Sequence, residues 1–86
     1  MQNRIIRGLS RDDLILARLI FVDGVSPSQA LIKIDPSSFS SSRVWHHRKN
    51  HAVRLVSKLR NRARLVYPGA SWDEVDALIR DALMEI

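Results

Sequence analysis

Residues 10–24 read SRDDLILARLIFVDG, and this stretch decides the fold class. Ser10 stands where a helix N-cap is expected, and the acid Asp13 follows three residues later, in a variant of the capping box. The residues from 14 to 22 are apolar almost all round, which predicts a central, buried helix. Asp23 and Gly24 end it, because glycine readily takes the left-handed conformation that follows a helix.

A second, short helix comes next in the sequence. Ser26 supplies an N-cap, and Pro27 occupies the first helical position, where a missing N–H costs nothing. The helix runs to Ile34 and ends before Pro36, because the residue preceding a proline avoids the helical conformation. A serine-rich loop follows.

The middle of the chain is basic and helical in its pattern. Residues 43–50 predict a short basic helix, and residues 51–66 predict a longer one with apolar positions at helical spacing. Asn50 either separates the two as a cap or lies within one bent helix.

The C-terminal segment predicts a last helix over residues 71–86. It follows a stop at residues 67–69, Tyr-Pro-Gly, and opens on a capping box formed by Ser71 and Glu74. Its apolar stripe either folds back onto the core or pairs with a second copy of the chain. We favour pairing, in which case this helix is an oligomerisation element. The whole chain, residues 1–86, is then a single all-α domain of about five helices.

Composition excludes several classes of protein. The chain has 86 residues, enough for one small domain. Its longest mostly apolar stretch, residues 14–22, is too short to cross a bilayer and contains Arg18, so we expect no membrane partner. The N-terminus lacks the apolar run of a secretory signal, and the absence of cysteine excludes disulfides and thiolate metal sites. We therefore expect a cytoplasmic protein.

Positive charge is concentrated in the middle of the chain. The net charge is +5, yet the segment from residue 36 to residue 72 has eight cations and no acid. Acids three or four residues away from these cations would form ion pairs with them and would indicate an ordinary solvent-exposed helix surface. This segment contains no such acids. A block of this kind is typical of phosphate binding, so we favour nucleic acid over an acidic protein partner or an idle surface.

Residues 10–50 have the element lengths of a helix-turn-helix unit, whose third helix enters the major groove of DNA with its N-terminal residues near base edges. The residues expected nearest the bases are Ser41, Ser42, Arg43, His46 and His47. The residues expected to contact phosphates are Arg48, Lys49, Arg54 and Lys58, with Arg62 continuing the stripe of Arg54 and Lys58 at a spacing of four.

The order of residues also suggests a family. Residues 18–34, RLIFVDGVSPSQALIKI, and residues 49–53, KNHAV, resemble the N-terminal DNA-binding region of bacteriophage terminase small subunits. Those have an aromatic-rich helix, a short turn, a Ser/Thr-Gln-Ala helix, a serine-rich turn and an Asn-x-x-Val segment. The resemblance implies recognition of viral double-stranded DNA for packaging in a bacterial host cell, delivery to a large terminase subunit, and a ring-like homo-oligomer.

A second, shorter resemblance points to another role. Residues 17–24, which include Val22-Asp23-Gly24, look like the lead-in to the helix-turn-helix of plasmid KorA-type repressors. This resemblance implies a small dimeric transcriptional repressor of a phage or plasmid. A basic module that binds RNA or a protein is a further alternative.

No residue pattern predicts catalysis, a metal or a cofactor. His47 and His51 are four residues apart and could face one ion, but a full ligand set is missing. The acid pairs at residues 12–13 and 73–74 occupy capping positions, which account for them. We therefore expect a protein that is not an enzyme.

Overall fold

The computed structural model describes residues 4–37 and 41–85. Over this part of the chain it is all-helical, as predicted, with four α-helices and no strand. The helices are α1 (Arg11–Phe21), α2 (Pro27–Ile34), α3 (Ser42–Val66) and α4 (Trp72–Met84).

The described residues form four helices where the sequence predicted about five, because the alternative of one continuous helix through Asn50 holds. The expected helices at residues 43–50 and 51–66 form the single helix α3, and Asn50 lies within it. The physical reason is that this stretch contains neither glycine nor proline. The low helix propensity of an exposed asparagine reduces helix stability too little to interrupt the helix.

Three helices begin at the serines that the sequence indicates. The hydroxyls of Ser10, Ser26 and Ser71 accept hydrogen bonds from backbone N–H groups three residues later. In α4 the Glu74 carboxylate also accepts from the N–H of Ser71, which completes the capping box. Gly24, with a φ of +72°, takes the left-handed conformation just after α1.

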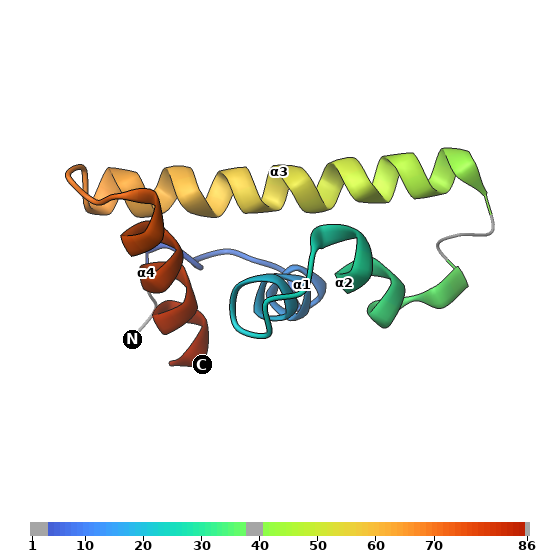
Figure 1. Cartoon of the computed structure of the whole chain (residues 1–86), viewed down its shortest axis with the longest axis horizontal. Coiled ribbons are helices and arrows are strands. Elements are labelled where there is room, and N and C mark those ends of the chain that lie inside the picture. The colour runs from blue at the N-terminus through green and yellow to red at the C-terminus, as the bar shows by residue number, and fades with distance from the viewer. Residues whose placement is uncertain (1–3, 38–40, 86) are drawn as a thin grey trace.

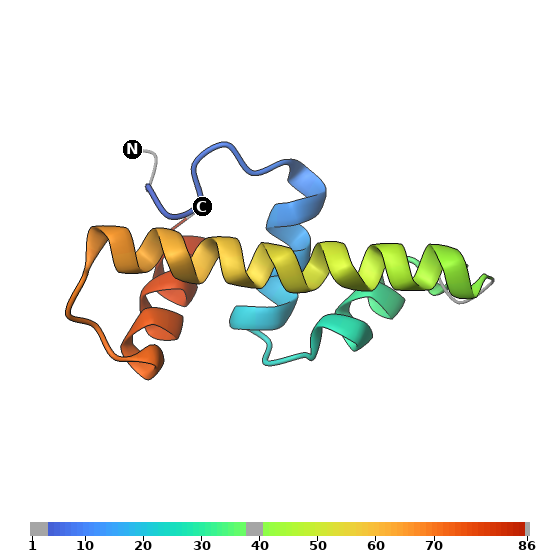
Figure 2. The same cartoon turned by 90° about the horizontal axis from the view of Figure 1, so that it is seen from above.

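The long helix α3 lies along one side of the molecule, and the other three helices pack beneath it (Figures 1 and 2). The molecule is accordingly elongated, with extents of 41 × 22 × 21 Å. α2 lies under the N-terminal half of α3 and α4 under its C-terminal half (Figure 1). α1 contacts all three other helices and is therefore central, as expected, but it is not buried as a whole: Leu16 and Ala17 are its only buried residues, and Ile15 is exposed.

The core forms where α1, α3 and α4 meet. Its largest fully buried side chains are Val75, Ile79 and Leu83 of α4, with Leu59 of α3. The apolar stripe of α4 thus closes the core of its own chain, which is the alternative to pairing with a second copy. None of the described helices has both the length and the apolar character needed to cross a membrane.

Candidate nucleic-acid interface

α3 presents two different faces. At 3.6 residues per turn, Ala52, Leu55, Leu59 and Ala63 fall on the side that is buried against the other helices. The opposite side is exposed and mostly polar, although the exposed Leu65 lies on it five full turns after His47, and we call this side the outward face of α3. Its members are Arg43, His46, His47, Asn50, Arg54, Ser57, Lys58 and Asn61.

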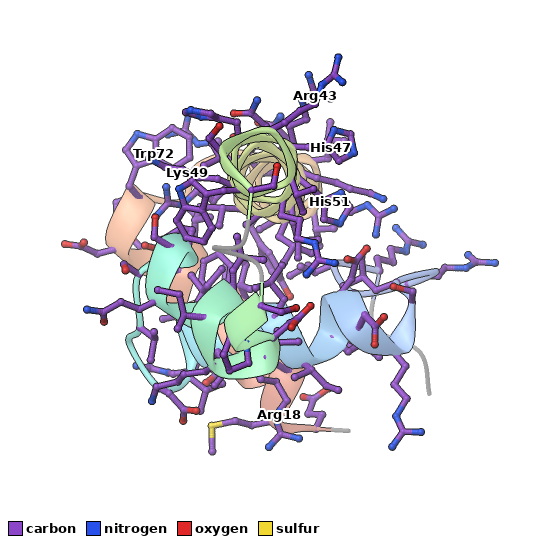
Figure 3. The ribbon with its side chains drawn as sticks, turned by 90° about the vertical axis from the view of Figure 1, so that its right-hand side faces the viewer. Arg18, Arg43, His47, Lys49, His51 and Trp72 are labelled. Carbon is purple, nitrogen blue, oxygen red and sulfur yellow. The ribbon has the colours of Figure 1, made fainter. Side chains whose placement is uncertain are left out.

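The outward face is unobstructed by the rest of the molecule. Seen along α3 from its N-terminal end, Arg43 and His47 point away from the other helices (Figure 3). Lys49 points to the opposite flank, where Trp72 of α4 also lies (Figure 3). Arg18 of α1 lies on the far side of the molecule (Figure 3).

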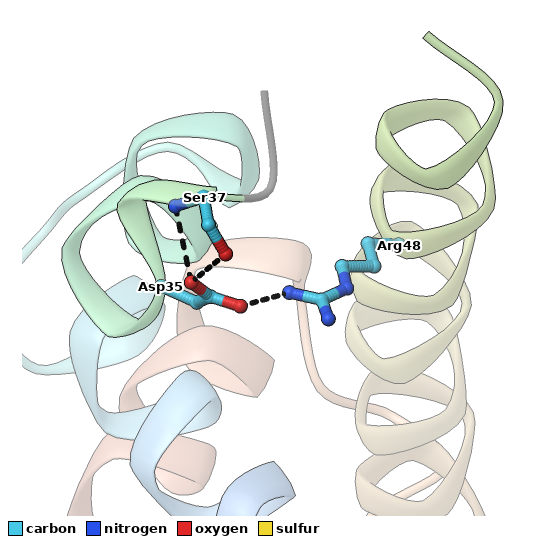
Figure 4. Close-up of polar contacts among 3 residues, drawn as sticks. All are labelled: Asp35, Ser37 and Arg48. Atoms are coloured by element: carbon cyan, nitrogen blue, oxygen red, sulfur yellow. Dashed lines mark hydrogen bonds and ion pairs between the residues drawn. The ribbon is translucent and has the colours of Figure 1, made fainter. Parts of the chain in front are cut away.

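Asp35, at the C-terminal end of α2, holds one of the α3 cations. Its carboxylate accepts from Arg48 Nη1 at 2.5 Å, and from the N–H and the hydroxyl of Ser37 at 3.0 and 2.5 Å (Figure 4). The Ser37 hydroxyl, followed by the Arg48 guanidinium, lowers the pKa of Asp35 below its ordinary value. Arg48 is therefore a link between α2 and α3.

A second carboxylate, Asp76 of α4, holds Arg60. Two parallel hydrogen bonds join Arg60 Nε and Nη2 to the carboxylate oxygens at 2.9 and 3.0 Å. This hydrogen bonding raises the pKa of Arg60. The same guanidinium lies 6.0 Å from the centre of the Phe21 ring, so Arg60 links α3 to both α4 and α1.

The last two arginines of α3 also have partners within the chain. Arg62 Nη1 donates to the backbone carbonyls of Ile5 and Arg7 at 3.2 and 2.7 Å, which ties the N-terminal segment to α3. The Arg64 guanidinium lies 4.1 Å from the centre of the Trp72 ring and donates to the carbonyl of Ala70 at 3.5 Å. Both side chains stabilise the fold.

The eight cations of the basic segment therefore divide into two groups. Arg48, Arg60, Arg62 and Arg64 contact other parts of the chain, as described above. The other four make no ion pair with any residue in the ranges 4–37 and 41–85: Arg43, Lys49, Arg54 and Lys58. Arg43, Arg54 and Lys58 share the outward face, whereas the predicted phosphate contacts Arg48 and Arg62 lie outside it.

The serines and histidines predicted near the bases gather at one end of α3. Ser41 is its N-cap, without a side-chain capping bond to a described residue, and Ser42 is its exposed first residue. His46 and His47 are exposed one turn further on.

His51 has a partner that the sequence did not indicate. Its Nε2 lies 2.9 Å from Asp13 Oδ1 of α1, so this ring faces a carboxylate. Within the described residues, no group of three or more His, Cys, Asp or Glu side chains could hold a metal ion.

Comparison with protein-family models, with curated proteins and with solved structures found no match for this chain.

Proposed function

We propose that this protein binds double-stranded DNA through the outward face of α3. One observation carries the proposal: a helix without any acid presents Arg43, Arg54 and Lys58 on a single exposed side, with no carboxylate of the described chain paired to them. Such a side attracts the phosphates of DNA, and release of condensed counterions then favours binding.

The dimensions of α3 suit the major groove. A helix of 25 residues is about 37 Å long, and its width matches the groove. A straight helix of this length follows the curved groove only over part of its course. We therefore assign Arg43 to base edges and Arg54 and Lys58, about 16 and 22 Å further along the axis, to the phosphate backbone.

The N-terminal end of α3 adds neutral donors. Ser41 and Ser42, together with the backbone N–H groups of the first turn, can hold a phosphate beside the groove. His46 and His47 lie between this end and Arg54 on the outward face, within reach of the same strand. Lys49 meets the backbone on the other flank.

Salt dependence of binding tests the proposal. If Lys49, Arg54 and Lys58 each neutralise one phosphate, the logarithm of the association constant should fall with the logarithm of salt concentration at a slope of about −2.7 per chain. Fluorescence anisotropy with a labelled duplex measures it. The variant Arg54→Ala should reduce the slope by about 0.9.

Arg18→Ala is the matched control, because this exposed arginine lies on the far side of the molecule (Figure 3). It should leave the slope unchanged. Absence of binding to any duplex at about 0.1 M salt would overturn the proposal and favour RNA or an acidic protein as the partner.

Within DNA binding, the resemblance to terminase small subunits leads us to propose a role in packaging viral DNA, with a large terminase subunit as partner. A dimeric repressor is the alternative. The mass of the protein in solution, measured by light scattering, separates the two: a ring of many copies supports packaging, and a dimer supports repression.

A further inference from the structure

Trp72 is a large aromatic side chain that the fold leaves 52% exposed. It is the first residue of α4 and lies against the flank of α3 near Arg64. An open cavity of about 360 Å³ adjoins the ring, and its other walls are Ser57, Arg60 and Asn61 of α3. Part of the exposed Trp72 side chain therefore borders a hollow with polar walls.

The cavity leaves part of the indole available. Arg64 covers the ring at 4.1 Å but does not line the cavity, so the guanidinium and the cavity meet different parts of the ring. Arg60 is held in place by its two hydrogen bonds to Asp76. Its charge is balanced there, so it acts as a fixed wall of the cavity.

These walls suit a nucleobase. Any base can stack on an exposed indole, since every base has a π face. The Asn61 amide offers both donors and an acceptor, and the Ser57 hydroxyl offers one of each, which matches the edge of a base.

The cavity is continuous with the outward face of α3. Ser57 and Asn61 belong to both, and Lys58 lies between them in the sequence. Arg54 is a neighbour of Ser57 on the helix surface, three residues earlier, so a strand whose phosphate contacts Arg54 passes close to the cavity. Bases inside a duplex are paired and stacked, so only an unpaired base can enter.

We infer that the Trp72 cavity binds an unpaired nucleobase next to the duplex, so that the preferred ligand is a DNA duplex with a single-stranded extension. This inference rests on the proposed function, because the duplex part of the ligand lies on the outward face of α3.

The experiment compares three labelled DNAs with the full chain: a blunt duplex, the same duplex with a four-nucleotide thymidine extension, and a thymidine oligonucleotide alone. We expect the extended duplex to bind about tenfold or more tightly than the blunt one. We also expect it to quench tryptophan fluorescence where the blunt duplex does not. The variant Trp72→Phe, which leaves Trp45 as the remaining tryptophan, should abolish the quenching and keep most of the affinity.

Two variants test the cavity itself. Trp72→Ala should bring the affinity for the extended duplex down to that for the blunt one. Because this change could disturb the packing of α4, Asn61→Ala serves as a second variant: Asn61 is exposed on α3, and alanine maintains a helix. It should weaken binding of the extended duplex more than binding of the blunt duplex.

The outcomes separate this inference from the proposed function. Equal affinity for blunt and extended duplexes, with unchanged fluorescence, overturns the inference and leaves duplex binding intact. Quenching by the thymidine oligonucleotide and by the extended duplex, without binding of the blunt duplex, overturns duplex binding and supports the cavity. Binding of none of the three DNAs overturns both.

Discussion

Arg60 of α3 and Asp76 of α4 meet side by side, with two parallel hydrogen bonds of 2.9 and 3.0 Å between guanidinium and carboxylate. Sixteen residues separate them in the sequence. The pair joins the helix that carries the exposed cations to the helix that closes the core. The Arg60–Asp76 pair therefore stabilises the fold. Because the charge of Arg60 is balanced by Asp76, it is not available to bind a ligand.

Replacing Asp76 with asparagine should lower the free energy of unfolding by about 1 kcal/mol. The loss is modest because both side chains are about 40% exposed, where water screens the attraction. Urea denaturation measures it. Asp81→Asn is the control, since Asp81 is 68% exposed and reaches only Arg80, at 4.0 Å, among the described cations. Equal losses in the two variants would contradict the role we assign to the pair.

Acid should weaken the link between α2 and α3. The pKa of Asp35 lies below its ordinary 3.8 in the folded chain, owing to Ser37 and then Arg48. A carboxyl of this kind stabilises the fold above its unfolded pKa, and the contribution is lost as the pH falls through its folded pKa. Thermal melting should therefore show Asp35→Asn below the parent at neutral pH, with the difference shrinking below about pH 4. A difference that persists unchanged into strong acid would speak against this.

Two leucines of α3 should respond very differently to truncation. Leu59 is fully buried against α4, so Leu59→Ala should cost about 3 kcal/mol of unfolding free energy. Leu65 is 82% exposed on the same helix, and Leu65→Ala should change stability by less than about 0.5 kcal/mol. Chemical denaturation of both variants checks the burial pattern of α3. Comparable losses would mean that Leu65 is covered in solution.

Two cations of the outward face should have separate roles in DNA recognition. Arg43→Ala should reduce the discrimination between DNA sequences by about 1–3 kcal/mol at one base pair, because arginine pairs with guanine edges. Lys58→Ala should weaken binding to all duplexes alike, since phosphate contacts carry no sequence information. Competition binding with a randomised duplex library measures both. A changed sequence preference in Lys58→Ala would show that our division between groove and backbone is wrong.

Local signals predicted the helices well. The serine caps at residues 10, 26 and 71 and the proline at position 27 act within a few residues, so their effect can be recognised in the sequence alone. The continuity of α3 through Asn50 was harder to predict, because asparagine either caps a helix or sits exposed within it. The packing of the residues around Asn50 decides whether it caps a helix or lies within one.

The division of the cations could not be predicted from spacing. Arg54, Lys58 and Arg62 form one stripe four residues apart, yet Arg62 turns to the carbonyls of Ile5 and Arg7, more than fifty residues away in the sequence. Arg48 likewise depends on Asp35, which reaches it only through the packing of α2 on α3. Which charges remain exposed is thus a tertiary property of the fold.

Because α3 runs unbroken from Ser42 to Val66, its two ends cannot tilt independently. A ligand bound at the Arg43 end therefore also fixes the direction of the opposite end of α3, to which α4 and its carboxylates are attached. The protein should therefore bind as one rigid body. The angle at which α3 lies on its ligand then determines which partners the carboxylates of α4 can contact.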